Sequence, residues 1–189
     1  MKYTKQQKQQ ILSLARLSIE TFLNMKRKID YTQLVGLDDY LLEEKATFVT
    51  LEKDGDLRGC IGSLEARREL YVDVIENAYS AAFEDYRFSP VKLKELKNIK
   101  IKISILSKPE NFEYNSVEDL VDYLDKVKPG VVLSDELGRR ATFLPVVWEQ
   151  LPDPLEFLDN LCVKAGLPKK CWQDCNIQIK TYQVESLGE

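Results

Sequence analysis

The chain has 189 residues, 44% hydrophobic and 31% charged, which suits one domain with a full core and a solvated surface. Its formal net charge of -4, from 27 basic and 31 acidic residues, argues against a nucleic-acid binder, because such proteins usually carry a basic excess. Histidine is absent, which excludes Ser-His-Asp and Cys-His catalysis, and no apolar run approaches the about 20 residues of a membrane span.

The N-terminal stretch MKYTKQQKQQ is polar and lacks the apolar run of a secretory signal. We therefore expect a cytoplasmic protein in a reducing compartment. Disulfides are rare in such compartments, so we expect Cys60, Cys162, Cys171 and Cys175 to be free thiols.

The first third of the chain predicts a helix followed by a hairpin. Apolar residues at helical spacing indicate a helix over 4–26, with Thr4 as its N-cap. Two apolar runs, 46–51 and 56–64, flank Asp54-Gly55, a dipeptide whose residues tolerate the positive φ of a tight turn. We expect residues 47–51 and 57–61 to pair in antiparallel register.

The middle of the chain predicts a helix over 69–84, a loop over 85–90 and a strand over 99–105 in which isoleucines alternate with polar residues. Ser116 can cap the following helix, since Glu118 and Asp119 lie in its first turn.

The last third predicts strands at 131–133 and 141–144, a helix that begins at Pro154 and ends before Gly166, and a strand over 176–184. Hairpins mixed with separated helices indicate an α+β fold, with a largely antiparallel sheet and flanking helices.

The segment Leu57–Gly62 is the most unusual stretch, because two glycines interrupt a strand. Such glycines mark a bulge or a close approach to the backbone, including that of a ligand. Simple alternation would place Arg58, Cys60 and Gly62 on one face, and an arginine near a thiol favours the thiolate. The alternative is that Cys60 is a small buried hydrophobic residue and the glycines make room for a packed helix. The local sequence favours the alternative.

The remaining cysteines carry little chemistry. The spacing of Cys171 and Cys175 could suit a metal loop, but a structural zinc site needs four ligands, and without histidine all four cysteines would have to converge. We therefore predict neither a metal nor a cofactor.

Several runs together resemble the AMMECR domain family over about residues 10 to 185. The strongest are Phe48–Leu51, Leu57–Gly62 and the Asp-x-Arg-Phe piece at 85–88. Further matching pieces lie at 74–78, 103–107, 141–145 and 165–168. The resemblance implies a single domain over 1–189, with a larger and a smaller lobe and the signature at 57–62. Ser63-Leu64 depart from the commoner family pattern of threonine and an aromatic.

The resemblance implies no assigned reaction, so whether the chain is an enzyme stays open. It implies membership in the AmmeMemoRadiSam system, with a Memo-type protein and a radical SAM enzyme as partners. The functional surface it implies centres on the signature and adds Arg87 and Thr142; its residues are Arg58, Gly59, Cys60, Ile61, Gly62, Arg87 and Thr142.

Two classes of function remain after this comparison. The first is a binding or adaptor module with a groove for a small anionic ligand or a partner. The second is an enzyme that uses Cys60 as a nucleophile or redox thiol, assisted by Arg58 or Arg87 and a carboxylate such as Asp85. Because no complete catalytic set is visible, the sequence favours binding. RNA binding is a third and weaker hypothesis, since the signature lacks interleaved aromatics.

Overall fold

The computed structural model describes residues 3–174 and 176–189, so Cys175 lies outside the described residues. The chain divides into two compact units, which we describe separately. The larger unit comprises the residues up to Lys108 together with Glu185–Glu189, and the smaller unit comprises Pro109–Val184. Within the described part of the chain, no helix has the length and apolarity needed to span a membrane.

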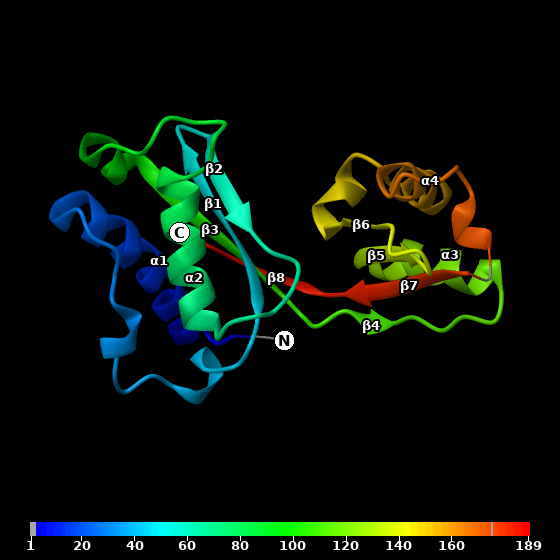
Figure 1. The fold of residues 1–189 in the computed structure, drawn as a ribbon, viewed down its shortest axis with the longest axis horizontal. Helices are drawn as coiled ribbons and strands as arrows, with labels where there is room; N and C mark the ends of the chain where they lie inside the picture. Colours follow the sequence, from blue (N-terminus) through cyan, green and yellow to red (C-terminus); the bar gives the residue numbers. More distant parts are fainter. Residues whose placement is uncertain (1–2, 175) are drawn as a thin grey trace. The chain divides into compact units, whose positions relative to one another are not determined.

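The larger unit contains a four-stranded sheet with the order β2-β1-β3-β8 (Figure 1). Its strands and helices in chain order are α1 (Lys5–Met25), η1 (Tyr31–Gln33), η2 (Asp39–Leu41), β1 (Ala46–Lys53), β2 (Asp56–Gly62), α2 (Leu70–Phe83), η3 (Leu93–Asn98), β3 (Ile99–Leu106) and β8 (Val184–Gly188). Thr4 caps α1 through a reciprocal capping box with Gln7. The expected hairpin is confirmed: β1 and β2 are antiparallel, and Asp54 and Gly55 both have positive φ.

Both helices of this unit pack on one face of the sheet. The shared core buries the isoleucine row of β3 together with Val49 and Leu51 of β1 and the apolar stripes of α1 and α2. The opposite face carries Thr50, Leu57, Cys60, Lys100 and Lys102, all half-buried or exposed; we call it the outer face. The sheet therefore separates an apolar layer from a polar one.

The smaller unit contains a second four-stranded sheet, with the order β4-β7-β5-β6. Its elements are β4 (Glu110–Asn111), α3 (Val117–Val127), β5 (Gly130–Asp135), β6 (Arg140–Phe143), η4 (Pro145–Glu149), α4 (Pro154–Lys164), η5 (Cys171–Gln173) and β7 (Ile177–Tyr182). Its three strand pairings are antiparallel. Trp148 and Phe157 stack in its core at a centroid distance of 3.7 Å. The predicted α+β class, with a larger and a smaller lobe, is confirmed.

Two expectations for this unit need correction. The predicted strand over 176–184 is two strands, since β7 ends at Tyr182 and β8 begins at Val184. The expectation of free thiols is wrong for Cys162 and Cys171, which form a disulfide. The reason is local: α4 ends before Gly166, whose φ of +75° lets the chain turn back, and η5 then lies beside the buried face of α4. The two Cα atoms are 6.1 Å apart, within disulfide reach.

Candidate functional site

The signature strand β2 packs tightly against α2 at Gly59. A Cβ atom at Gly59 would lie 2.1 Å from the carbonyl oxygen of Ala81, so no side chain fits there. At Gly62 a Cβ atom would lie 2.2 Å from the carbonyl oxygen of Thr47. Gly59 thus makes room for helix α2, as the packing alternative predicted, whereas Gly62 makes room for the backbone of β1. Ile61 packs against the core.

Arg58 does not sit beside the thiol as simple alternation would place it. The register shifts between Leu51↔Gly59 and Glu52↔Leu57, so Arg58 is the extra residue of a β-bulge. Its Nε and Nη2 atoms each donate to the Glu95 carboxylate of η3 at 3.3 Å. The alternation argument fails because a bulge changes which residues share a face.

The Glu95 carboxylate binds basic side chains of two strands at this end of the sheet. Besides Arg58, the ammonium group of Lys53 lies 3.3 Å from Glu95, and the backbone N–H of Lys92 donates to it at 2.9 Å. The hydrogen bonds from Arg58 are the main reason that the pKa of Glu95 falls to about 2. Glu95 therefore stays ionised and ties β1, β2 and η3 together.

Cys60 is held through its backbone by two side chains that follow α2. Its N–H donates to Oδ2 of Asp85 at 2.9 Å, and its carbonyl oxygen accepts from Nη2 of Arg87 at 3.1 Å. Its sulfur lies 3.2 Å from the hydroxyl of Thr50, the residue opposite it on β1. The thiol therefore belongs to the outer face and is half-buried.

Asp85 and Arg87 form a bidentate ion pair. Nε of Arg87 donates to Oδ1 at 2.9 Å and Nη2 donates to Oδ2 at 2.7 Å, while the N–H of Arg87 also donates to Oδ1. Asp85 is buried, and the hydrogen bonds from Arg87 hold the pKa of its carboxyl well below the usual range. The Arg87 side chain remains 43% exposed.

Thr142, the last predicted site residue, lies on β6 in the smaller unit. Its hydroxyl donates to the carbonyl oxygen of Val131 at 2.8 Å and lies 3.0 Å from the Tyr182 hydroxyl. Burial raises the pKa of Tyr182 to about 12. The structure thus brings Cys60, Asp85 and Arg87 together, pairs Arg58 with Glu95, and assigns Thr142 to a different unit.

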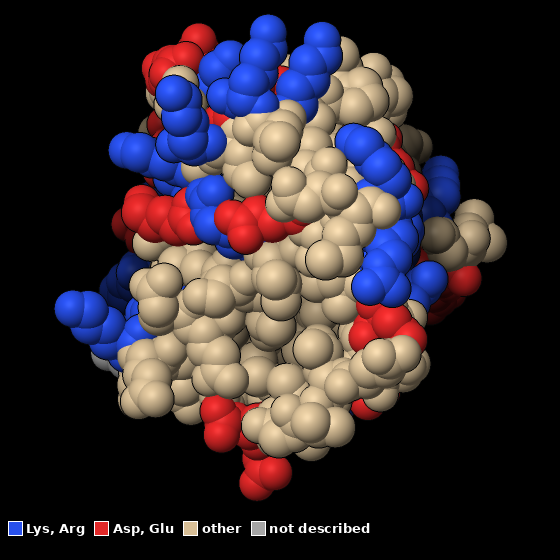
Figure 2. Space-filling view, turned by 90° about the vertical axis from the view of Figure 1, so that its left-hand side faces the viewer, with Lys and Arg blue, Asp and Glu red and all other residues tan. Residues whose placement is uncertain are grey.

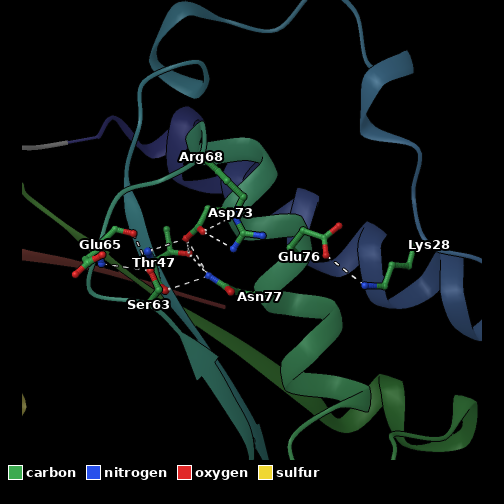
Figure 3. A network of polar contacts seen from close by, with 8 residues as sticks. All are labelled: Lys28, Thr47, Ser63, Glu65, Arg68, Asp73, Glu76 and Asn77. Atoms are coloured by element: carbon green, nitrogen blue, oxygen red, sulfur yellow. Dashed lines mark hydrogen bonds and ion pairs between the residues drawn. The ribbon is translucent and has the colours of Figure 1, made fainter.

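A buried polar cluster next to the signature received no role in the sequence analysis (Figure 3). Asp73 and Asn77 of α2 meet Thr47 at the start of β1: the Thr47 N–H and hydroxyl both donate to Asp73, as does the Asn77 amide. Arg68 adds two hydrogen bonds to the other Asp73 oxygen. The sequence signal for this cluster is the spacing of Asp73 and Asn77, which are four positions apart and so lie on one side of α2. Buried polar side chains need hydrogen-bond partners, because burial without them costs free energy.

This cluster fixes the loop that follows β2. The N–H of Ser63 donates to the carbonyl oxygen of Thr47, and the Ser63 hydroxyl donates to the carbonyl oxygen of Glu65 (Figure 3). Asp73 accepts five hydrogen bonds, three at Oδ2 and two at Oδ1, so both of its oxygens are satisfied within the protein. We therefore regard the cluster as support for the signature strand rather than as a site.

Among residues 3–174 and 176–189, no group of three or more Cys, Asp or Glu side chains is arranged to hold a metal ion. The part of the chain described also has one cysteine outside the disulfide, Cys60.

Comparison with known proteins identifies the fold and the family. A protein of Methanothermobacter thermautotrophicus is 37% identical over 95% of this chain and 92% of its own length. A protein of Methanopyrus kandleri, MK0488, is 34% identical over 97% of this chain and 89% of its own length. The crystal structure of the uncharacterized protein PH0010 from Pyrococcus horikoshii matches with a TM-score of 0.73 and 30% identity, covering 93% of this chain and 88% of that one. The AMMECR1 family model matches residues 12–187, so the chain belongs to the AMMECR1 family.

Proposed function

We propose that the chain is a binding or adaptor module that recognises a ligand or a partner protein beside the signature strand. The observation that carries this proposal is the closed hydrogen-bond system of Asp85. Its carboxylate accepts three hydrogen bonds from Arg87 and one from the N–H of Cys60. A carboxylate bonded in this way does not take a proton from a thiol, so Asp85, which binds the Cys60 N–H, is a positioning group rather than a base.

Arg87 is the group best suited to contact a ligand. Its described hydrogen bonds use Nε and Nη2, and its side chain is 43% exposed. A guanidinium fixed by a buried carboxylate is a preorganised donor for a carboxylate or a phosphate. The outer face adds the exposed Lys100, whereas Lys102 on the same face is paired with Glu52 at 2.6 Å. Arg87 and Lys100 favour a small anionic ligand or an acidic surface over a neutral one.

The partners we propose are a Memo-type protein and a radical SAM enzyme, as family resemblance implies. The test is to measure binding of the purified chain to each of these two proteins from the same genome by calorimetry. Arg87→Ala and Arg87→Lys should both weaken binding, because neither keeps the guanidinium fork. Arg139→Ala is the matched control, since Arg139 also pairs with an aspartate of its own turn but lies in the smaller unit.

Failure of both proteins to bind, or equal loss with the Arg139 control, would remove the partner proposal. Thermal melting of each variant separates weakened binding from unfolding. Mass spectrometry of the native protein for a co-purified small molecule tests the ligand form of the same proposal.

The second candidate is a cysteine-dependent enzyme that uses Cys60 with Arg87. The observation in its favour is that Cys60 is half-exposed on the outer face and keeps a free thiol. We expect iodoacetamide to label Cys60 slowly in the native protein, since no general base contacts the sulfur among its described hydrogen bonds. Fast labelling at neutral pH would place the enzyme hypothesis first. Cys60→Ser would then abolish a reaction without weakening partner binding.

A further inference from the structure

The turn that follows α2 displays one aromatic side chain to solvent. Tyr86 is 95% exposed, although both of its neighbours are fixed: Asp85 is buried and Arg87 is bound to Asp85 and to Cys60. The N–H of Phe88 closes the turn by donating to the carbonyl oxygen of Asp85 at 3.0 Å. Tyr86 therefore stands on a rigid backbone while its own ring contributes no burial to the fold.

Rigid display of a tyrosine has an energetic meaning. An exposed aromatic ring gains most by desolvation against a partner, and a turn that is already ordered loses little entropy when the partner binds. Tyrosine and arginine are also the residue types enriched among the few that dominate interface energies. Tyr86 and Arg87 combine both in adjacent positions.

The elements bonded to the Tyr86 turn expose further apolar side chains. The ion pair of Arg58 with Glu95 and the hydrogen bond of Arg87 to Cys60 join β2, this turn and η3. These elements expose two apolar side chains, Leu57 at 45% and Leu93 at 56%. We name Leu57, Tyr86, Arg87, Leu93 and Lys94 the Tyr86 patch.

The charge that this patch presents outward is positive. Lys94 and Lys97 of η3 and its N-cap residue Lys92 are exposed, whereas Glu95 is bound by Arg58 and Lys53. The exposed acids on the same elements are Glu84 and Asp56, fewer than the basic groups. Figure 2 shows lysines and arginines at the upper part of this unit, with acidic side chains beside and below them, above a broad uncharged area. On a chain with a net charge of -4, the exposed side chains of these elements therefore carry a local basic excess.

We infer that the Tyr86 patch docks an acidic segment of a partner protein, with Tyr86 packing on an apolar residue of that segment and Arg87 and Lys94 facing its carboxylates. The inference rests on the proposed binding function and names the chemistry of the partner. Exposed apolar side chains on elements that also expose basic ones complement a peptide in which acidic residues flank an apolar one.

The test uses the full chain and a defined probe. The probe is a fluorescein-labelled peptide in which glutamates flank a central Leu-Phe pair, and the control peptide carries lysines in place of the glutamates. We expect the acidic peptide to bind, the basic one not to bind, and affinity to fall as salt rises. Tyr86→Ala should weaken binding about thirtyfold, the loss typical of an anchor residue.

Two matched controls separate this patch from general surface effects. Val35→Ala removes an apolar side chain that is 90% exposed in the same unit, and it should leave the affinity unchanged. Lys94→Glu should weaken binding, whereas Lys169→Glu, an exposed lysine of the smaller unit, should not. Equal binding of both peptides, or equal effects of Tyr86→Ala and Val35→Ala, would overturn the inference. If Arg87 variants lose the partner while Tyr86 and Lys94 variants keep it, the proposed function stands and this inference fails.

Discussion

Each unit contains a turn in which an aspartate binds an arginine that follows it closely. The two turns differ in whether the aspartate also binds a residue outside the turn. In the smaller unit, Asp135 accepts from the N–H groups of Leu137 and Arg139 and from Nε of Arg139, all within the β5–β6 hairpin. In the larger unit, Asp85 makes the same kind of bonds to Arg87 and then also binds Cys60, which lies 25 residues earlier. The same local device closes a hairpin in one unit and joins a helix end to the signature strand in the other.

The largest effect that separates the two turns should come from removing the aspartates. Asp85→Ala leaves the Cys60 N–H without its acceptor and the Arg87 guanidinium without its partner, and we expect a loss of about 3–5 kcal/mol in the free energy of unfolding. Asp135→Ala should cost clearly less, since the hydrogen bonds described for Asp135 stay within its own hairpin and hold no second element. Urea unfolding of both variants measures the difference; equal losses would mean that the bond to Cys60 contributes nothing.

Reduction of the disulfide should destabilise the smaller unit selectively. Cys162 and Cys171 are nine residues apart, and a closed loop of this size is worth about 2–3 kcal/mol. Cys162→Ala with Cys171→Ala should lower the melting temperature and increase amide exchange in α4 and η5, while β1 and β2 exchange as before. Exchange that rises equally in both units would show that the two units do not unfold independently.

A glycine of the signature strand and a glycine of the β5–β6 turn test how closely β2 packs on α2. Gly59→Ala drives a methyl group into the carbonyl oxygen of Ala81, so β2 must move from α2, at a cost of about 1–3 kcal/mol. In Gly138→Ala the new methyl group meets no atom within 4 Å, so the loss of stability comes only from the positive φ at this position and is about 1 kcal/mol. Chemical denaturation ranks the two, and a larger loss at Gly138 would contradict the packing argument.

The smallest effect should be a pH dependence that belongs to the larger unit. The pKa of Glu95 falls from 4.5 to about 2, so the folded state favours its ionised form. This contribution is present above pH about 4.5 and is lost as the pH falls toward about 2. In Glu95→Gln the fall in stability over this range should be shallower than in the parent. If stability depends on pH equally in Glu95→Gln and in the parent, ionisation of Glu95 contributes nothing to the pH dependence of folding.

The sequence predicted those features that depend on neighbouring residues. Asp54 and Gly55 fix the β1–β2 hairpin, Thr4 begins α1, and Gly166 ends α4, because caps and tight turns need only local chemistry. The bulge at Arg58 escaped prediction, since a bulge exists only relative to the strand it pairs with. The Cys162–Cys171 disulfide was not predicted for a related reason: it depends on η5 packing against α4. In addition, the expectation of a reducing compartment predicted free thiols.

Of the residues predicted for the site, the structure brings Cys60 and Arg87 together and places Thr142 in the smaller unit. Cys60 and Arg87 do meet, yet through the backbone of Cys60 and not through its sulfur. Arg58 was expected to face the thiol, and Glu95, which binds it, was not expected at all. Such pairings form between elements 25 to 40 positions apart, and residue spacing along one strand says nothing about them.

The bonds from Asp85 and Arg87 to Cys60 also have a consequence for association between chains. β2 is the outermost strand of its sheet, and an outermost strand offers free N–H and C=O groups to any other extended chain. At Cys60 a carboxylate takes the N–H and a guanidinium takes the C=O, as a neighbouring strand would. The two side chains therefore end the sheet at this position. Loss of Arg87 would expose the edge of β2, to which a strand of another chain could then pair. Self-association of the Arg87 variants, measured by light scattering, should therefore accompany their loss of binding.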